Sequence, residues 1–155
     1  MKLRGSITET IDAPPAKVFA LLCDIDRLPE WNALIQRIVE RPAEMARDAE
    51  WVVEMRAMGN TWNSRSRVIE HDRGALRFCY RSQTDDGNPS YGLWTWTVQD
   101  AGSHAATVTV TWELHPKTFA RRALLARVRH RQLRKEVRES VRAVERALTA
   151  PAEAR

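Results

Sequence analysis

The most constraining feature of this sequence is the long amphipathic stretch Pro116–Leu148, which predicts a single helix near the C-terminal end. When successive residues are turned by about 100°, the apolar side chains fall within one narrow stripe, and arginines and lysines lie opposite. The apolar spacing follows the helical period rather than a strict heptad, so a coiled-coil seam is the weaker interpretation. The stripe contains Phe119, Ala123, Ala126, His130, Leu133, Val137, Val141, Val144 and Leu148.

The stripe is uneven along its length. Its downstream half is filled with leucine and valine, whereas its upstream half offers Ala123, Ala126 and His130. Small residues where a core normally has bulky ones indicate either that another element packs closely or that a space is left. We favour the space, which would be a cavity beside the helix.

Length and composition indicate one globular unit. We predict a single domain over residues 1–149 and a short tail at 150–155, because a chain of 155 residues can bury a core of its own. A hydrophobic content of 43% and a charged content of 29% are typical of soluble globular proteins. Six tryptophans are many for this length, and such rings often line ligand pockets, although core positions would explain them equally well.

The two cysteines and the N-terminal stretch indicate in which cellular compartment the protein is expected. Cys23 and Cys79 lie in different predicted elements without metal-type spacing, which favours a reduced, cytoplasmic protein. The stretch from Met1 to Gly5 leads into an alternating strand rather than an apolar segment, so we expect no signal peptide. No apolar run approaches the length that spans a membrane, and we predict no transmembrane segment.

The net charge of +5 is concentrated in the predicted helix. Between Lys117 and Arg142 there are ten lysines and arginines against Glu136 and Glu139, a local excess of +8. Such a face could meet nucleic acid, anionic lipid or an acidic carrier protein, or it could simply be solvated. We favour the solvated face and predict no nucleic-acid partner, because no nucleic-acid-binding motif accompanies the charge.

The rest of the chain alternates with a period of two. A strand at residues 2–11 precedes a helix at Ala16–Cys23 and a second short helix that starts at Asp24 and closes near Asn32. Six further strands are separated by short turn sequences, which indicates consecutive antiparallel hairpins. These strands are predicted at Leu34–Arg41, Glu50–Met58, Thr61–His71, Ala75–Gln83, Ser90–Gln99 and His104–His115.

The order of elements is therefore strand, two short helices, six strands and a long helix, an α+β fold. Only the long helix is able to cover one face of a seven-stranded antiparallel sheet, and the twist of the sheet would curl it round that helix. Alternation divides the strands into an apolar inner face and a polar outer face. The inner set is Trp51, Val53, Met55, Ala57, Trp62, Ser64, Ser66, Val68, Leu76, Phe78, Tyr80, Trp94, Trp96, Val98, Ala106, Val108, Val110 and Trp112.

The sequence carries a family resemblance that covers essentially the whole chain and is clearest near its beginning. The run Ile11–Phe19, followed by Leu22, Asp24 and the sequence Pro29-Glu30-Trp31, resembles the opening of the START-like, or SRPBCC, superfamily. The match is closest to its polyketide cyclase/dehydrase and lipid-transport branch. The resemblance implies a helix-grip fold with a deep apolar cavity between a curled sheet and the last helix. Members bind lipids, sterols, polyketides or hydrophobic hormones, and some catalyse cyclisation or dehydration. The opening run transfers no catalytic residue.

Candidate ligand-binding residues are the inward positions around the expected cavity. Ser64 and Ser66 are small polar residues on an apolar face, as expected of groups that orient a ligand carbonyl or hydroxyl, but they could equally mark a bend or an edge of the sheet. Glu70 follows the same inward alternation at the end of its strand, where we expect it at the rim. The set is Trp51, Val53, Met55, Trp62, Ser64, Ser66, Phe78, Tyr80, Trp94, Trp96, Ala126 and His130.

His130 is the one candidate for catalysis. It lies on the helix stripe, and histidine is the side chain type best suited to the acid–base chemistry that a polyketone requires. The alternative, a histidine satisfied at the pocket edge, is the interpretation we favour. His71, His104, His115 and His130 are scattered without metal-ligand spacing, and there is no phosphate-binding glycine loop. We therefore predict no metal and no cofactor.

Three functions remain open at this point. The first is a non-catalytic carrier or sensor that binds a hydrophobic small molecule such as a lipid or polyketide. The alternative is a cofactor-independent polyketide cyclase or dehydratase, for which the basic helix face would dock an acidic carrier protein. The third is an interaction protein that uses the basic face alone. We rank them in that order, with the first two close.

Overall fold

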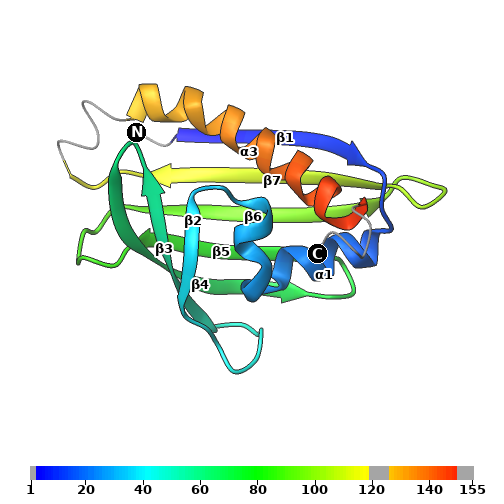
Figure 1. Ribbon diagram of the computed structural model, residues 1–155, viewed down its shortest axis with the longest axis horizontal. Coiled ribbons are helices and arrows are strands. Elements are labelled where there is room, and N and C mark those ends of the chain that lie inside the picture. The colour runs from blue at the N-terminus through cyan, green and yellow to red at the C-terminus, as the bar shows by residue number, and fades with distance from the viewer. Residues whose placement is uncertain (1–2, 119–125, 150–155) are drawn as a thin grey trace.

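The computed structural model describes residues 3–118 and 126–149, with the side chains of 126–129 excepted (Figure 1). The described elements follow the predicted order, and the α+β class is confirmed. The strands are β1 (Leu3–Ile11), β2 (Ile35–Glu40), β3 (Glu50–Ala57), β4 (Asn60–Asp72), β5 (Arg77–Thr84), β6 (Tyr91–Asp100) and β7 (Ala106–His115). The helices are α1 (Pro15–Cys23), the 3₁₀ turn η1 (Ile25–Arg27), α2 (Leu28–Trp31) and α3 (Ala126–Thr149).

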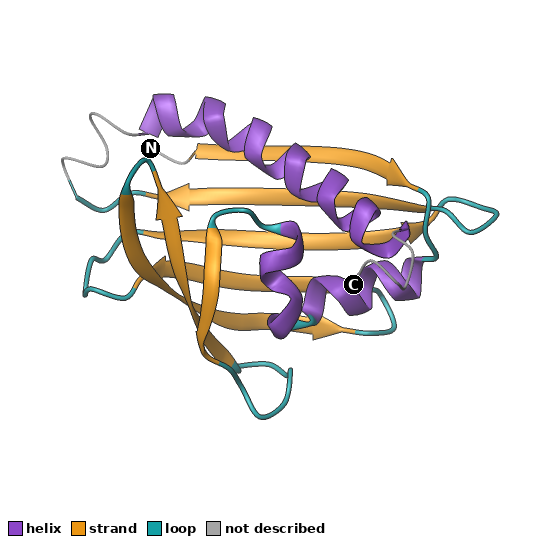
Figure 2. Cartoon of the chain, viewed as in Figure 1, coloured by secondary structure: helices purple, strands orange, loops and turns teal. Residues whose placement is uncertain are grey.

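All seven strands belong to one antiparallel sheet in the order β1-β7-β6-β5-β4-β3-β2. Strands β2 to β7 follow one another through hairpins, and β1 pairs with β7 at the far edge. The sheet curls, so that β2 and β3 run steeply across the direction of β6 and β7 (Figure 1). Figure 2 shows the helices gathered on one side of this curled sheet. The curled antiparallel sheet and the covering C-terminal helix form the expected helix grip.

The beginning of the last helix differs from the prediction. Residues 116–118 are not helical, α3 is described from Ala126 onward, and the predicted stripe residues 119–125 lie outside the described residues. The backbone N–H of Lys117 donates to the Ser90 hydroxyl at 2.9 Å, which holds this segment beside the start of β6. The prediction of a helix starting at Pro116 is therefore wrong.

A bulge in β4 overturns a second expectation. The register with β5 shifts between Val68 and Glu70, so the alternation of side chains reverses after Val68. Glu70 turns to the outer face, where its carboxylate pairs with Arg77 at 2.8 Å. His71 takes the inward position instead and stacks on Phe19 with ring centroids 5.7 Å apart. The inward assignment of Glu70 is corrected accordingly.

Ion pairs and a hydrogen bond hold helix α3 alongside β1. The Glu9 carboxylate on β1 pairs with Arg138 at 3.1 Å and with Arg142 at 2.9 Å. One helical turn further on, Glu145 accepts the backbone N–H of Asp12 at 2.8 Å. The helix also buries leucine and valine against the sheet, which supplies most of the packing energy. These buried residues are Leu133, Val137, Val141 and Val144.

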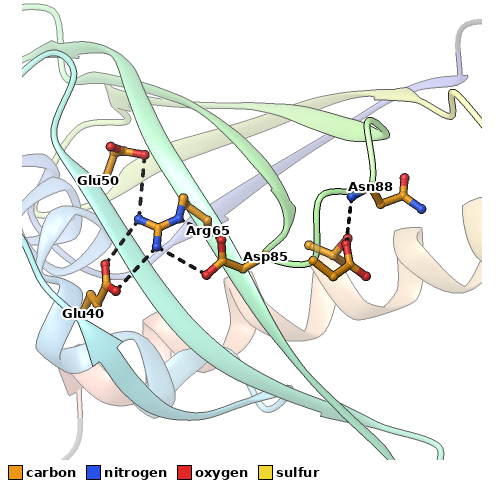
Figure 3. A network of polar contacts seen from close by, with 7 residues as sticks. Glu40, Glu50, Arg65, Asp85 and Asn88 are labelled. Carbon is orange, nitrogen blue, oxygen red and sulfur yellow. Dashed lines mark hydrogen bonds and ion pairs between the residues drawn. The ribbon is translucent and has the colours of Figure 1, made fainter.

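The outer face of the sheet is polar and carries its own network, drawn in Figure 3. Arg65 on β4 donates to Asp85 at 2.9 and 3.3 Å and to Glu40 at 3.3 and 3.5 Å, and lies 3.9 Å from Glu50. The hydrogen bonds to Asp85 contribute most to raising the pKa of Arg65. The network ties β2, β3, β4 and the turn after β5 together on the face away from the helices.

Candidate ligand-binding cavity

A cavity of about 1030 Å³ lies between the inner face of the sheet, α2 and α3. Alternation places large side chains of β3, β5 and β6 on its walls, while the small Ser64 and Ser66 of β4 leave the space open. From α3, the buried Leu133 and Val137 and the half-buried Ala143 contribute the opposite wall. On the helix side the cavity is bounded by the downstream part of α3, whereas Ala123 and the side chain of Ala126, from which a space was inferred, lie outside the described residues.

Ten of the residues singled out from the sequence lie on the cavity wall. They come from β3, β4, β5 and β6 and are Trp51, Val53, Met55, Trp62, Ser64, Ser66, Phe78, Tyr80, Trp94 and Trp96. For Ala126, the structure describes the helical backbone, and its side chain lies outside the described part.

His130 is half-buried but is not among the described residues that line the cavity. Its Nε2 atom lies 3.1 Å from the backbone carbonyl oxygen of Arg4, and its ring lies 6.2 Å from that of Trp112. At this level the helix stripe faces β1 and β7, so the imidazole is engaged with the sheet edge rather than with the cavity.

The structure adds wall residues that sequence reasoning did not select. Ser82 follows Tyr80 by two positions on β5, so the same alternation would have found it. Trp31 on α2 was interpreted as part of a family motif, yet it also lines the cavity. Glu136 and Ser140 of α3 lie on one flank of the apolar stripe. A helical projection cannot say which flank faces an opening in the sheet.

Aromatic rings make the wall rigid. Trp31 meets Trp96 edge to face with ring centroids 5.3 Å apart. Trp51 meets Tyr80 in the same manner at 5.1 Å and stacks on Phe78 at 6.0 Å. Such contacts fix the ring orientations, so the wall is shaped before any ligand arrives.

Hydroxyl groups also lie among these apolar side chains, including those of Ser66, Tyr80 and Ser82. The Tyr80 oxygen accepts a hydrogen bond from Trp96 Nε1 at 3.2 Å. Burial raises the pKa of Tyr80 to about 12, so its hydroxyl stays protonated near neutral pH. The Oγ atoms of Ser66 and Ser82 lie 2.5 Å apart, and Ser66 is only 4% exposed.

Charged groups also line the cavity. Four carboxylates contribute from α2, from the turn after β5 and from α3: Glu30, Asp86, Glu136 and Glu139. Among the described lining residues, the basic ones are the exposed Arg146 and the half-buried His115. The Nε2 atom of His115 lies 2.6 Å from a Glu113 carboxylate oxygen. Within the described ranges, no cluster of three or more metal-ligating side chains is found.

A second depression of about 550 Å³ lies outside this cavity, around the loop before β3 and the end of β4. It is open, and charged residues such as Glu44, Arg47 and Arg73 line it. The larger, less open and largely apolar cavity is the better candidate site, because ligand pockets bury most of the surface of a small molecule.

Comparisons with known proteins agree with the fold. A family model described as "Polyketide cyclase / dehydrase and lipid transport" matches residues 2–149. None of the curated proteins compared with the chain matches it. No helix within the described residues is both long enough and apolar enough to cross a membrane.

Three solved structures illustrate the similarity, which at these identities shows the fold alone. Ara h 8.0201 is 18% identical with a TM-score of 0.76, covering 97% of this chain and 100% of that one. A START superfamily protein from Mycobacterium smegmatis is 12% identical with a TM-score of 0.75, covering 94% and 96%. The Zhui aromatase/cyclase from Streptomyces sp. R1128 is 16% identical with a TM-score of 0.70, covering 97% and 98%.

Proposed function

The chain belongs to the polyketide cyclase/dehydrase and lipid-transport family of START-like proteins, and we propose that it binds a hydrophobic small molecule as a carrier or sensor. Family and fold support a role either in binding a hydrophobic ligand or in polyketide cyclase-type chemistry. The choice between the two depends on the polar groups of the cavity.

The observation that carries the proposal is the cavity of about 1030 Å³ with its aromatic and aliphatic walls. A ligand that buries about 300 Å² of apolar surface there gains roughly 7 kcal/mol. Part of that free energy offsets the loss of translational and rotational freedom on binding. Rigid walls reduce the further cost of ordering side chains, which supports affinities in the range of a small-molecule carrier.

The polar groups on the inner face of the sheet support binding rather than catalysis. The Ser66 and Ser82 hydroxyls are hydrogen-bonded to each other, and Tyr80 is protonated near neutral pH. Tyr80 is therefore able to donate a hydrogen bond but is a poor general base. His130 lies away from the described cavity wall.

One observation keeps the catalytic alternative as a second candidate. Glu136 is a half-buried carboxylate of α3 that lines the cavity opposite the hydroxyls of β4 and β5. A cofactor-independent cyclase or dehydratase would use it as the base. Conversion of a bound polyketone during incubation, abolished by Glu136→Gln without loss of binding, would replace the carrier proposal.

The carrier proposal is tested with N-phenyl-1-naphthylamine, an uncharged dye whose fluorescence rises in apolar surroundings. Ser64→Asp places a carboxylate on the cavity wall, and Ser64 has no hydrogen bond in the described structure to lose. A bound dye would strip water from that carboxylate, so we expect affinity to fall by at least about tenfold.

The matched control is Asn63→Asp, which makes the same change of net charge at the next residue, on the exposed outer face of β4. We expect its affinity for the dye to stay within about twofold of the unchanged protein. Equal binding by the two variants would contradict a ligand in the cavity, and so would a protein that takes up no dye.

An acidic carrier protein at the basic helix face stays a prediction. Two arginines of that face, Arg138 and Arg142, are paired with Glu9, which lowers the charge available to a partner. Arg131, Arg134 and Lys135 are exposed. Pull-down with an acidic carrier protein at low and high salt would test this docking.

A further inference from the structure

Three hydroxyl groups occupy adjacent inward positions on β4 and β5. Ser66 pairs directly with Ser82 in the register of these strands, and Val68 pairs with Tyr80. Tyr80 and Ser82 are two residues apart and therefore lie on the same face of the sheet. All three line the cavity, and we name them the hydroxyl subsite.

The hydrogen bonds of the hydroxyl subsite leave donors unused. A hydroxyl has one hydrogen to donate and two lone pairs to accept. The Tyr80 oxygen accepts from Trp96, and the described residues provide no acceptor for its own hydrogen. Ser66 and Ser82 share one hydrogen bond, in which one hydroxyl donates and the other accepts. The accepting hydroxyl keeps its own hydrogen, and the described part of the chain provides no acceptor for it. The subsite thus has two hydrogens to offer a ligand.

Unused donors in an apolar wall discriminate between ligands. A hydrocarbon that fills the cavity would remove water from these hydroxyls and give nothing in return, which is unfavourable. A ligand with an acceptor oxygen at the same place would complete their hydrogen bonds. The subsite therefore favours an oxygenated ligand over an equally shaped hydrocarbon, even though the hydrocarbon leaves water more readily.

The charges along the cavity exclude one kind of oxygenated ligand. Four carboxylates line the cavity, those of Glu30, Asp86, Glu136 and Glu139, and Glu30 is paired with Arg27; the basic lining residues described are Arg146 and His115. An anionic head group would lie near these carboxylates, and the described lining residues of β3 to β6 include no lysine or arginine to pair with it. A carboxylate is thus a poor ligand, whereas a ketone, quinone or ether carries an acceptor without charge.

We propose that the hydroxyl subsite determines specificity, and that the ligand is an uncharged apolar molecule with at least one carbonyl-type acceptor oxygen held by Tyr80 and the Ser66–Ser82 pair. This inference rests on the proposed function and adds the chemical class of the ligand. It also gives the two serines a role that neither a bend nor an edge of the sheet would require.

The test is displacement of bound N-phenyl-1-naphthylamine by three compounds built on the same tricyclic skeleton: fluorene, 9-fluorenone and fluorene-9-carboxylate. We expect 9-fluorenone to compete roughly two- to tenfold better than fluorene, the effect of one net hydrogen bond. Fluorene-9-carboxylate should compete least. Simple partition into an apolar space would give fluorene the advantage, so the order of the first two compounds is informative.

Two variants test whether the hydroxyl subsite causes the preference for 9-fluorenone. Ser66→Ala combined with Ser82→Ala removes both partners of one hydrogen bond and so leaves no unpaired group. Tyr80→Phe removes the other donor but leaves Trp96 Nε1 without its acceptor, so its folding needs a check by circular dichroism. Each should reduce the preference for 9-fluorenone while still binding the dye. Ser6→Ala removes an exposed hydroxyl on the outer face and should leave the preference unchanged.

The outcomes separate this inference from the proposed function. Absence of dye binding overturns both. Dye binding with fluorene preferred over 9-fluorenone overturns the inference alone. Dye binding with a preference for 9-fluorenone that persists in both the double serine variant and Tyr80→Phe also overturns the inference, because the acceptor would then be held elsewhere.

Discussion

Replacing Gly5 with alanine adds a single methyl group, but it should lower the free energy of unfolding of this protein strongly. Gly5 on β1 lies directly opposite Trp112 on β7. A Cβ atom at Gly5 would lie 2.8 Å from Trp112 Nε1 and closer still to Cζ2 and Cε2, whereas ordinary contacts start at 3.4 Å. Trp112 is fully buried, with 0% exposure, and its ring packs 6.0 Å from that of Trp94. The indole therefore has little room to retreat.

The magnitude follows from the overlap. Forcing an extra methyl group into a packed core costs about 1–3 kcal/mol, and we expect the upper end because both strands are fixed by their pairing. About 3 kcal/mol corresponds to a fall in Tm of roughly 6–12 °C for a protein of this length. Urea unfolding followed by far-ultraviolet circular dichroism measures the same change without relying on the fluorescence of Trp112.

Two further variants make the reasoning refutable. Ser6→Ala, an alanine at the next residue on the exposed outer face, should change stability by less than about 0.5 kcal/mol. Trp112→Phe frees space opposite Gly5, so the double variant should be more stable than the two single effects predict, by at least about 1 kcal/mol. A Gly5→Ala protein as stable as the parent, or strictly additive effects, would refute the steric argument.

Two other predictions concern charge. Burial raises the pKa values of Cys23 and Tyr80 to about 12 from 9.0 and 10.0, so the fold favours their neutral forms. The free energy of unfolding should therefore be unaffected by these groups below about pH 8 and fall as pH rises toward 12. Urea midpoints at neutral and alkaline pH should show a smaller fall in Cys23→Ala and Tyr80→Phe; an unchanged fall would count against the burial. Glu9→Gln removes the partner of Arg138 and Arg142, whose side chains are 60% and 47% exposed, so the loss should stay below about 1 kcal/mol and shrink with added salt. A loss that is independent of salt would contradict an ionic origin.

Much of the fold could be predicted because the relevant signals are local. Turn sequences and a period of two placed every described strand within two residues of its observed ends. The bulge after Val68 could not be predicted, since an extra residue in β4 breaks no sequence rule and reveals itself only in the pairing with β5. The start of α3 was misjudged for a similar reason. The Lys117–Ser90 hydrogen bond joins residues far apart in the chain.

The cavity was predictable to the extent that it is made of strands. Alternation assigns Trp51, Tyr80 and Trp96 to one face without knowledge of their neighbours, and the structure brings them together on the cavity wall. The helix is harder to interpret. Its apolar stripe contacts β1 at one level and lines the cavity at another. His130 and Val137 therefore look equivalent in a helical projection. Of these two residues, Val137 lines the cavity and His130 contacts β1.

The most direct test of the central claim, a hydrophobic ligand inside the cavity, uses the six tryptophans as reporters. Each indole N–H gives one signal in a ¹H–¹⁵N spectrum, and the signals can be assigned by substituting one tryptophan at a time. Trp31, Trp51, Trp62, Trp94 and Trp96 line the cavity, whereas Trp112 is buried beside Gly5 and does not. On saturation with N-phenyl-1-naphthylamine, the account predicts shifts for the five cavity indoles and little change for Trp112. A spectrum in which the cavity indoles stay in place would contradict it.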